Sequence, residues 1–468
     1  MKVHLIAACG VGMSALAALL REAGHEVSGS DENAYPPAST ILEALGLDLQ
    51  RGWDPARVEG TDLVVCGNAV RRTNPEAMAA EAAGRRMVSF PQAMEELFLV
   101  DRRPLVVTGT HGKTTSASML AWVLRETGRD PGYLIGGAPL GLPSSAVLGG
   151  GPWFVIEGDE YDSAYFDKEP KFLHYHPAVL LLNAIEFDHA DIYADLTAVK
   201  GAFEKLLRGL DATVPTIACA DFPEVANVVG GRAGVQWFGL TPAAAWRVDE
   251  LRDDGRTHFV VREHGRPVVR VSLQTPGAIN ARNALGVLLV ARVAGVEWEE
   301  AAAALATFRG VRRRQEVVGS ARGIVVIDDF AHHPTAVLET LKALRLRYPE
   351  RRLRAVFEPR SNTSRRAVFQ DAYRRALVLA DDAVVAAVFS KESDPIPAAE
   401  RLDVERLARD VAAEGTPCRV LEGVETIHAH VLETARPGDV IVVMSNGAFG
   451  GLPRRLAEAL GAGGQPDA

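Results

Sequence analysis

The stretch LVVTGTHGKTT (residues 105–115) joins a β-branched run to an Ala- and Leu-rich segment at 114–126 that is typical of a helix. A strand, a glycine-containing loop, a Gly-Lys-Thr sequence and a helix form a phosphate-binding loop, because the loop N–H groups and the helix N-terminus face the anion. The lysine reaches the outer phosphates, and the threonine after it can bind Mg²⁺. We therefore expect an α/β domain whose nucleoside triphosphate site is formed by Gly109, Thr110, His111, Gly112, Lys113, Thr114 and Thr115.

The loop departs from the common P-loop spacing, which would place a glycine where this chain has Val107. Packing alone gives no reason for GKTT at a strand–helix junction, so we keep the triphosphate assignment. Such a site needs an acid for its metal, and the apolar strand at 153–156 ends in Glu157, followed by Asp159 and Glu160. Mg²⁺ is a hard ion that prefers oxygen ligands. We expect Glu157 to hold it, with Asp159 and Glu160 as weaker candidates; the alternative is that these acids only cap the strand in solvent.

The next predicted strand covers residues 179–185 and runs into a second acidic segment, IEFDHAD (185–191). In this segment His189 lies between Asp188 and Asp191. A histidine at a strand end can be a metal ligand or a proton shuttle, although a lone histidine usually has neither role. The acidic neighbours favour a metal or substrate contact here.

The N-terminal strand runs into another glycine-containing turn, GVGMSA, which begins at Gly10 and continues through Gly12. Asp31 closes the second predicted strand, 19 residues after Gly12. This GxGxxA pattern is typical of a dinucleotide-binding fold, with the acid on a ribose hydroxyl. Two interpretations stay open from the residues alone: a bound nucleotide or nucleotide-sugar, or merely a tight strand–helix turn.

The C-terminal part also carries polar residues where strands end. The segment DDFAHHP (328–334) precedes a helix, EPRSNT (358–363) follows the next strand, and SNGAFGG (445–451) follows the last strong strand. Ligands in open α/β sheets bind at the carboxyl ends of strands, so Arg360 can form a forked pair with a substrate carboxylate. The alternative is a surface arginine in an ordinary loop. The adjacent histidines point in different directions, which argues against a two-histidine zinc site.

The strand–helix alternation predicts three α/β domains, at 1–103, 104–315 and 316–468. Residues 230–275 are polar and turn-rich, which favours a small antiparallel patch, and 461–468 is expected to be a frayed tail. Apolar runs predict strands at 2–8, 26–29, 62–66, 86–89, 105–107, 153–157, 179–185, 323–328, 352–357, 383–389 and 439–444.

Composition excludes several classes of protein. The net charge of −9 disfavours a nucleic-acid partner. The longest apolar runs, such as 383–389, fall short of the roughly 20 residues of a membrane span, so no membrane partner is expected. The start does not resemble a signal peptide and the four cysteines are scattered, which together indicate a reducing, cytoplasmic location. No GxSxG, HExxH or zinc-type spacing supports hydrolase chemistry. The oligomeric state is not readable from the sequence.

Two nucleotide-type turns on separate blocks, followed by a third α/β block, resemble the Mur ligases. The resemblance covers nearly the whole chain and implies a Rossmann-like N-terminal domain for UDP-N-acetylmuramate, a central P-loop ATPase domain and a Rossmann-like C-terminal domain for the incoming amine. In this family the first domain binds UDP and not NAD, which weakens the dinucleotide interpretation of Asp31. The implied catalytic residues are Lys113, Glu157 and His189. The implied Mg²⁺ ligands are Thr114, Glu157 and His189, and the further ATP contacts are Asn280, Asn283, Arg314 and Asp329.

Finer features resemble one branch of the family, which joins the tripeptide L-Ala-γ-D-Glu-meso-diaminopimelate to UDP-N-acetylmuramate in peptidoglycan recycling. These features are Gly29-Ser30-Asp31, Tyr35-Pro36-Pro37, Ser39-Thr40, Glu160-Tyr161-Asp162, Phe166-Asp167-Lys168, residues 171–175 and residues 358–363. The implied substrate contacts are Gly10, Gly12, Met13, Ser14, Ser30, Asp31, Asn68, His332, Arg360, Ser361, Asn362 and Asn446. We do not expect the carbamylated lysine of some Mur ligases at Lys200.

Three alternatives remain. The nearest is the branch that adds L-alanine, which differs at the features above. A nicotinamide-dependent oxidoreductase would explain GxGxxA and Asp31 but not GTHGKTT. A non-catalytic nucleotide switch would leave the third α/β block without a role.

Overall fold

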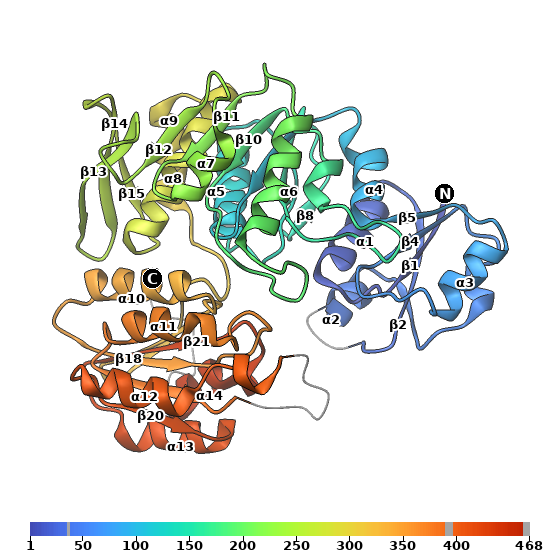
Figure 1. The fold of residues 1–468 in the computed structure, drawn as a ribbon. Coiled ribbons are helices and arrows are strands. Elements are labelled where there is room, and N and C mark those ends of the chain that lie inside the picture. Colours follow the sequence, from blue (N-terminus) through green and yellow to red (C-terminus); the bar gives the residue numbers. More distant parts are fainter. Residues whose placement is uncertain (35–37, 389–395, 462–468) are drawn as a thin grey trace.

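The chain forms three α/β units, each built on its own sheet (Figure 1). The computed structural model describes residues 1–34, 38–388 and 396–461, so the motif Tyr35-Pro36-Pro37 and the tail after Gly461 lie outside the described residues. Three sheets of this kind confirm the predicted three-domain α/β architecture. The exact domain boundaries, at 103/104 and 315/316, stay a prediction.

The N-terminal unit is a five-stranded parallel sheet in the order β3-β2-β1-β4-β5, which is the strand order of a dinucleotide-binding fold. The sequence did not predict β3, because its residues DLQR lack an apolar pattern and lie at the edge of the sheet. The strands are β1 (Lys2–Ile6), β2 (Glu26–Asp31), β3 (Asp48–Arg51), β4 (Leu63–Cys66) and β5 (Met87–Ser89). The helices are α1 (Val11–Glu22), α2 (Ala38–Ala44), α3 (Pro75–Ala82) and α4 (Phe90–Met94).

The central unit carries a ten-stranded sheet in the order β15-β14-β13-β12-β11-β10-β6-β9-β7-β8. The antiparallel patch predicted for 230–275 is present from β13 onward, but it is not separate: β13 pairs in parallel with β12 and extends the main sheet. The strands are β6 (Arg103–Thr108), β7 (Gly132–Leu134), β8 (Ala146–Val147), β9 (Trp153–Gly158), β10 (Val179–Leu182), β11 (Thr216–Cys219), β12 (Gln236–Gly239), β13 (Trp246–Asp253), β14 (Thr257–Glu263) and β15 (Arg266–Leu273). The helices are α5 (Lys113–Glu126), α6 (Leu196–Gly209), α7 (Pro223–Val229), α8 (Gly277–Val293) and α9 (Trp298–Thr307).

The C-terminal unit has a six-stranded sheet in the order β16-β17-β21-β18-β19-β20, parallel except for the edge strand β16. The strands are β16 (Glu316–Ala321), β17 (Ile324–Asp329), β18 (Arg352–Phe357), β19 (Asp382–Ala386), β20 (Cys418–Leu421) and β21 (Asp439–Met444). The helices are α10 (Pro334–Arg347), α11 (Gln370–Leu377), α12 (Val404–Ala413), α13 (Val424–Thr434) and α14 (Leu452–Ala459).

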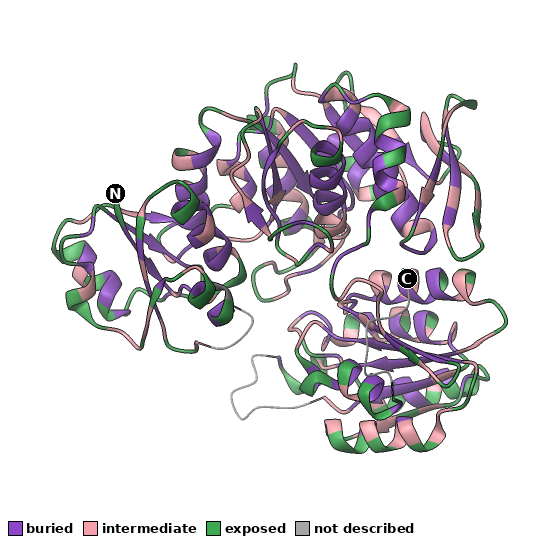
Figure 2. Ribbon diagram, turned by 180° about the vertical axis from the view of Figure 1, so that it is seen from behind, coloured by how far each residue is buried: buried purple, intermediate pink, exposed green. Residues whose placement is uncertain are grey.

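The inner parallel strands are buried on both faces under helices, as Figure 2 shows, which is why their sequences are near-continuous apolar runs; the edge strands β3 and β20 are partly exposed. The central and C-terminal units meet where α10 packs against α8. Arg347 at the end of α10 pairs with the buried Asp253 of β13 at 2.5 Å and also donates to Gln274 O at 3.1 Å. Among the helices of the described ranges, none is long and apolar enough to span a membrane.

Candidate active site

The predicted phosphate loop is present between β6 and α5. Gly109 has a φ of 123°, and a methyl group on it would lie 2.6 Å from Ala184 N, so the loop packs closely on the segment after β10. Thr110 N donates to Ala184 O at 2.8 Å in the same contact. Gly112 is the N-cap of α5 with a φ of 80°. Because Gly112 has no side chain, the first N–H groups of α5 have no side-chain cap to compete with an anion.

Lys113, the first residue of α5, points into a group of acids. Its Nζ is 2.9 Å from Glu160 Oε2 and 3.9 Å from Asp159 Oδ1, and it donates to Gly109 O at 2.7 Å. Burial alone would lower the pKa of Lys113, but the carboxylates of Glu160 and Asp159 outweigh it and raise the pKa. The ammonium group is therefore charged at neutral pH.

Thr114 and Glu157 bring two oxygens together at the start of α5. Thr114 Oγ1 donates to Glu157 Oε2 at 2.8 Å, and Gly136 N donates to Glu157 Oε1 at 2.5 Å. Adjacent ligands of an octahedral Mg²⁺, each at about 2.1 Å, lie about 3 Å apart. Burial, helped by Asp159, raises the pKa of Glu157, which a divalent cation would reverse. The donor set thus fits a magnesium ion.

Glu160 is the acid that contacts His189 directly. Its side chain is 1% exposed, and Oε1 is 3.5 Å from His189 Nε2 while Oε2 contacts Lys113. Burial would raise the pKa of Glu160, but Lys113 and His189 lower it to about 2. The same contact with Glu160 outweighs burial and raises the pKa of His189. Glu160, which is itself buried, thus bridges Lys113 and His189, and the shared Mg²⁺ site of Glu157 and His189 stays a prediction.

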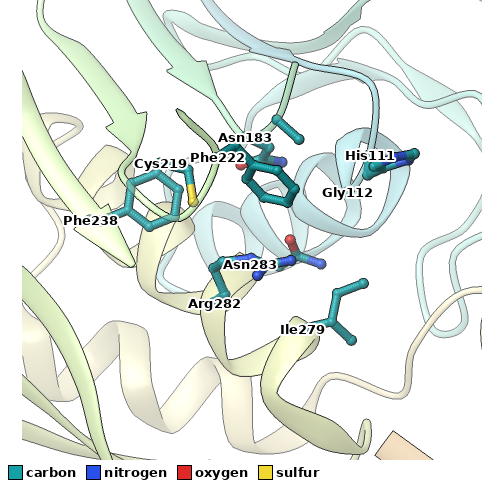
Figure 3. A pocket seen from close by; sticks show the side chains of 10 residues that line it. His111, Gly112, Asn183, Cys219, Phe222, Phe238, Ile279, Arg282 and Asn283 are labelled. Atoms are coloured by element: carbon teal, nitrogen blue, oxygen red, sulfur yellow. The ribbon is translucent and has the colours of Figure 1, made fainter. Parts of the chain in front are cut away.

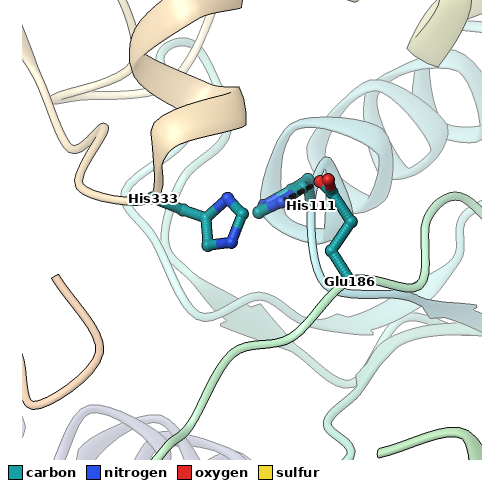
Figure 4. A group of neighbouring side chains, drawn as sticks. All are labelled: His111, Glu186 and His333. Atoms are coloured by element: carbon teal, nitrogen blue, oxygen red, sulfur yellow. Dashed lines mark ion pairs between the residues drawn. The ribbon is translucent and has the colours of Figure 1, made fainter. Parts of the chain in front are cut away.

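A second cluster, formed by His111, Glu186 and His333, joins the phosphate loop to the C-terminal unit (Figure 4). His111 Nε2 is 2.8 Å from Glu186 Oε2, and the rings of His111 and His333 lie 4.6 Å apart. Glu186 Oε1 also accepts from Thr335 Oγ1 of α10 at 2.9 Å.

The ligand atoms of this cluster lie within 4.8 Å of one another, a spacing that suits a metal. Hydrogen bonds occupy the His333 ring instead. Nδ1 accepts from Thr335 N at 3.3 Å and caps α10, so Nε2 carries the proton and donates to Phe187 O at 3.2 Å. Burial and His111 lower the pKa of His333 to about 4, so it is neutral. The cluster is a contact between units that the sequence did not reveal, because its members are far apart along the chain.

A narrow pocket opens beside the phosphate loop, between it and the start of α8 (Figure 3). Asn283 lines this pocket and Asn280 does not, and the ATP contacts expected of both residues stay predictions. Asn280 Nδ2 donates to Gln315 Oε1 at 2.9 Å and to Pro276 O at 2.8 Å, tying α8 to the linker before β16. The lining residues are His111, Gly112, Asn183, Ala184, Cys219, Phe222, Phe238, Ile279, Arg282 and Asn283.

Arg314 and Asp329 lie together at the junction of the central and C-terminal units. Burial lowers the pKa of Arg314, although Asp329 opposes that shift, and the guanidinium carbon lies 4.8 Å from the Phe330 ring centroid. Asp329 Oδ2 accepts from Gln315 N at 2.8 Å and Oδ1 from Ala331 N at 2.6 Å. Since both oxygens bind the backbone in this conformation, the ribose contact of Asp329 stays a prediction.

The N-terminal turn has the predicted strand–turn–helix form, with Gly10 as N-cap of α1. Asp31 accepts from Cys9 N at 2.8 Å and from Asn33 N at 2.9 Å, so it shapes the turn. The Ser30 hydroxyl is buried and donates to Glu76, and it is therefore not presented to a ligand. The remaining predicted contacts, Gly12, Met13, Ser14 and the exposed Asn68, surround this edge of the sheet and stay predictions.

The residues predicted to bind substrate in the C-terminal loops differ in their exposure and in their hydrogen bonds to the protein. Arg360 is 58% exposed and has Glu358 at 3.8 Å. The Ser361 hydroxyl accepts from Ser364 N at 2.9 Å, and Asn362 Oδ1 accepts from Arg365 at 3.0 Å, so both also stabilise the local turn.

The same loop contacts the segment after His189, because Thr363 Oγ1 accepts from Ala190 N at 3.2 Å. His332, another predicted substrate contact, has its Nδ1 3.1 Å from Phe330 O, and burial lowers the pKa of His332.

Asn446 Oδ1 is buried without a hydrogen-bond partner in the described residues. Lys200 lies on α6 and pairs with Glu224 at 2.6 Å.

Comparison with known proteins gives consistent matches along the chain. The catalytic-domain model of the Mur ligase family matches residues 2–102, the Mur ligase middle domain 107–291, and the Mur ligase glutamate ligase domain 313–447. A relative from Escherichia coli (strain K12) is 41% identical over 466 residues, 98% of each chain. It is a UDP-N-acetylmuramate--L-alanyl-gamma-D-glutamyl-meso-2,6-diaminoheptandioate ligase.

Two solved structures are similar over almost the full length. A murein peptide ligase from Psychrobacter arcticus 273-4 has a TM-score of 0.69 and 34% identity, covering 100% of both chains. A UDP-N-acetylmuramate-alanine ligase from Thermotoga maritima has a TM-score of 0.80 and 25% identity, covering 98% of this chain and 99% of that one. Sequence identity is thus higher to the first and spatial similarity to the second.

Proposed function

The chain belongs to the Mur ligase family, and on that premise we propose that it joins L-Ala-γ-D-Glu-meso-diaminopimelate to UDP-N-acetylmuramate with ATP, in peptidoglycan recycling. The observation that carries the proposal is the 41% identity, over 98% of both chains, to the Escherichia coli enzyme of that name. The spatial similarity to the alanine ligase of Thermotoga maritima, with a TM-score of 0.80, supports L-alanine as the second candidate amine.

The chemistry needs an activated acid, because an amide does not form from a free carboxylate at a useful rate. A carboxylate oxygen of the muramoyl group bonds to the γ-phosphorus of ATP, the bond to the β,γ-bridging oxygen breaks, and ADP leaves. The tripeptide amine then attacks the acyl carbon, loses a proton and displaces phosphate. The protein contributes mainly positioning and charge neutralisation.

The geometry distributes these tasks over the three units. Lys113 and the N-terminus of α5 would neutralise charge on the γ-phosphate. Thr114 and Glu157 would hold Mg²⁺, which would further neutralise the negative charge of the phosphates. Glu160 contacts both Lys113 and His189, and a second metal or the acyl group would be placed beside His189.

Substrate binding is assigned to the loops at the carboxyl ends of the outer sheets. The N-terminal turn around Gly10 would bind the UDP group. Arg360, with Ser361 and Asn362, would orient the carboxylates of the tripeptide. We place the reaction in the cytoplasm, because it consumes ATP and all four cysteines are free thiols.

Initial rates of phosphate release test the proposal. The protein, ATP, Mg²⁺ and UDP-N-acetylmuramate are mixed with the tripeptide, with L-alanine, or with no amine. We expect turnover that requires both UDP-N-acetylmuramate and the tripeptide. Turnover with L-alanine but not with the tripeptide would support the second candidate. No phosphate release with either amine would contradict the proposed substrates.

A further inference from the structure

Lys171 lies between the two loops that the proposed function assigns to the two nucleotides. It begins a short 3-10 turn (Lys171–His174) that packs against α4 of the N-terminal unit. Its side chain is only 13% exposed, and Nζ donates to Asp159 Oδ2 at 3.3 Å. Since Asp159 Oδ1 is 3.9 Å from Lys113 Nζ, one carboxylate links Lys171 to the lysine of the phosphate loop.

Contacts on its other side lead to the N-terminal turn. Nζ of Lys171 lies 5.7 Å from the ring centroid of Phe90, the first residue of α4. A methyl group on Gly12 would lie 3.4 Å from that ring, so Phe90 packs against the turn itself. A row of contacts thus runs from Gly12 through Phe90, Lys171 and Asp159 to Lys113. The muramoyl group of a substrate held at the turn has to cross this same distance to reach the γ-phosphate.

The ammonium group of Lys171 has N–H groups that could donate to a ligand. An ammonium carries three N–H groups, and within the described residues Asp159 is the acceptor placed on it. The Tyr161 ring, whose centroid is 4.1 Å from Nζ, attracts the cation without supplying an oxygen acceptor. Glu157, Asp159 and Glu160 would repel an entering carboxylate, so a cation is needed on the side that faces the N-terminal unit.

We propose that Lys171 binds the lactyl carboxylate of UDP-N-acetylmuramate and holds it for attack on the γ-phosphate, an inference that rests on the proposed function. One carboxylate oxygen accepts from the ammonium group while the other bonds to phosphorus as the bond to the bridging oxygen of ADP breaks. Lys171 keeps its proton throughout.

Lys171→Met in the full-length protein tests this by calorimetric titration with two probes. UDP-N-acetylglucosamine has the same nucleotide and sugar as UDP-N-acetylmuramate but lacks the lactyl carboxylate. We expect binding of UDP-N-acetylmuramate to weaken about 10- to 100-fold, the size of a charge-assisted hydrogen bond, and binding of UDP-N-acetylglucosamine to stay as in the wild type. Unchanged binding of the second probe also shows that the variant is folded.

The matched control is Lys168→Met, because Lys168 is 67% exposed and pairs with Asp162 at 2.6 Å. It should bind both probes as the wild type does. A second readout is the scrambling of ¹⁸O from the β,γ-bridge of ATP without tripeptide, which reports acyl phosphate formation. It should slow in Lys171→Met and recover in part in Lys171→Arg.

Two outcomes would overturn the inference, and a third would refute the proposed function on which it rests. If Lys171→Met weakened the binding of both probes equally, Lys171 would only support the interface between the N-terminal and central units. Wild-type affinity for UDP-N-acetylmuramate with wild-type scrambling would remove Lys171 from the site. A wild-type protein that neither binds UDP-N-acetylmuramate nor scrambles the isotope would instead refute the proposed function itself.

Discussion

Replacing Lys113 with methionine should destabilise the protein as well as inactivate it, because it leaves Glu160 buried without its main partner. The pKa of Glu160 lies about 2, against an ordinary value of 4.5. At about 1.4 kcal/mol per pKa unit, the charged form of Glu160 is favoured by about 3 kcal/mol despite its burial. Removing one partner of a buried pair costs about 3–5 kcal/mol.

Lys113→Met and Glu160→Gln should therefore each lower the free energy of unfolding by roughly 3 kcal/mol. The double variant loses the pair only once and leaves neither charge uncompensated. Its loss should fall short of the sum of the two single losses by at least about 2 kcal/mol. Urea-induced unfolding at neutral pH without nucleotide measures all four proteins of this cycle.

The chain offers a matched control cycle on an exposed pair. Lys168 and Asp162 are joined at 2.6 Å, but Lys168 is largely exposed, so Lys168→Met and Asp162→Asn should couple by no more than about 1 kcal/mol. A coupling between Lys113 and Glu160 as small as that of the control would refute the view that a buried pair fixes the lysine of the phosphate loop.

Three further predictions concern single substitutions. Gly112→Ala should destabilise the protein by at least about 1–2 kcal/mol and weaken ATP binding in calorimetry, because φ is 80° and the new methyl would lie 2.7 Å from Asn283 Oδ1; wild-type stability and affinity would contradict this. The pKa of His333 is about 4 in the folded protein against 6.5 ordinarily, so the unfolded chain binds protons more tightly between these values. Stability should be complete above pH 6.5 and fall by up to about 3 kcal/mol as the pH drops toward 4, and His333→Asn, which can still cap α10, should flatten this part of the unfolding profile. Arg360→Ala should raise the KM for the tripeptide about tenfold or more with little change in kcat, and an unchanged KM would remove Arg360 from the site.

The elements that the sequence predicted well are those with local signals. The phosphate loop followed from glycines and Lys113 at a strand–helix junction, and many of the buried parallel strands followed from their apolar runs, although the buried strand β11 was not predicted. The edge strands β3 and β16 were not predicted, because half-exposed strands at the edge of a sheet have no continuous apolar run. Several predicted strands end earlier than expected; β1 ends at Ile6, since Ala7 has a φ of 64° and turns the chain.

For the candidate site, the sequence indicated individual residues but not which of them contact one another. The order of residues along the chain does not say which of Glu157 and Glu160 contacts His189; in the structure Glu160 does, while Glu157 contacts Thr114. Glu186 and His333 were missed because their contact depends on how two units dock, which no local pattern records. The resemblance to a family supplied the substrates, because the residues alone left both a bound nucleotide or nucleotide-sugar and a simple turn open at Gly10.

The most direct test of the central claim is a competition between the two amines. The protein is incubated with ATP, Mg²⁺, UDP-N-acetylmuramate and equimolar L-alanine and L-Ala-γ-D-Glu-meso-diaminopimelate, and the UDP-linked products are weighed by mass spectrometry. Our account predicts the tripeptide adduct as the dominant product, with one ADP formed for each amide bond. A product that carries L-alanine alone would contradict it.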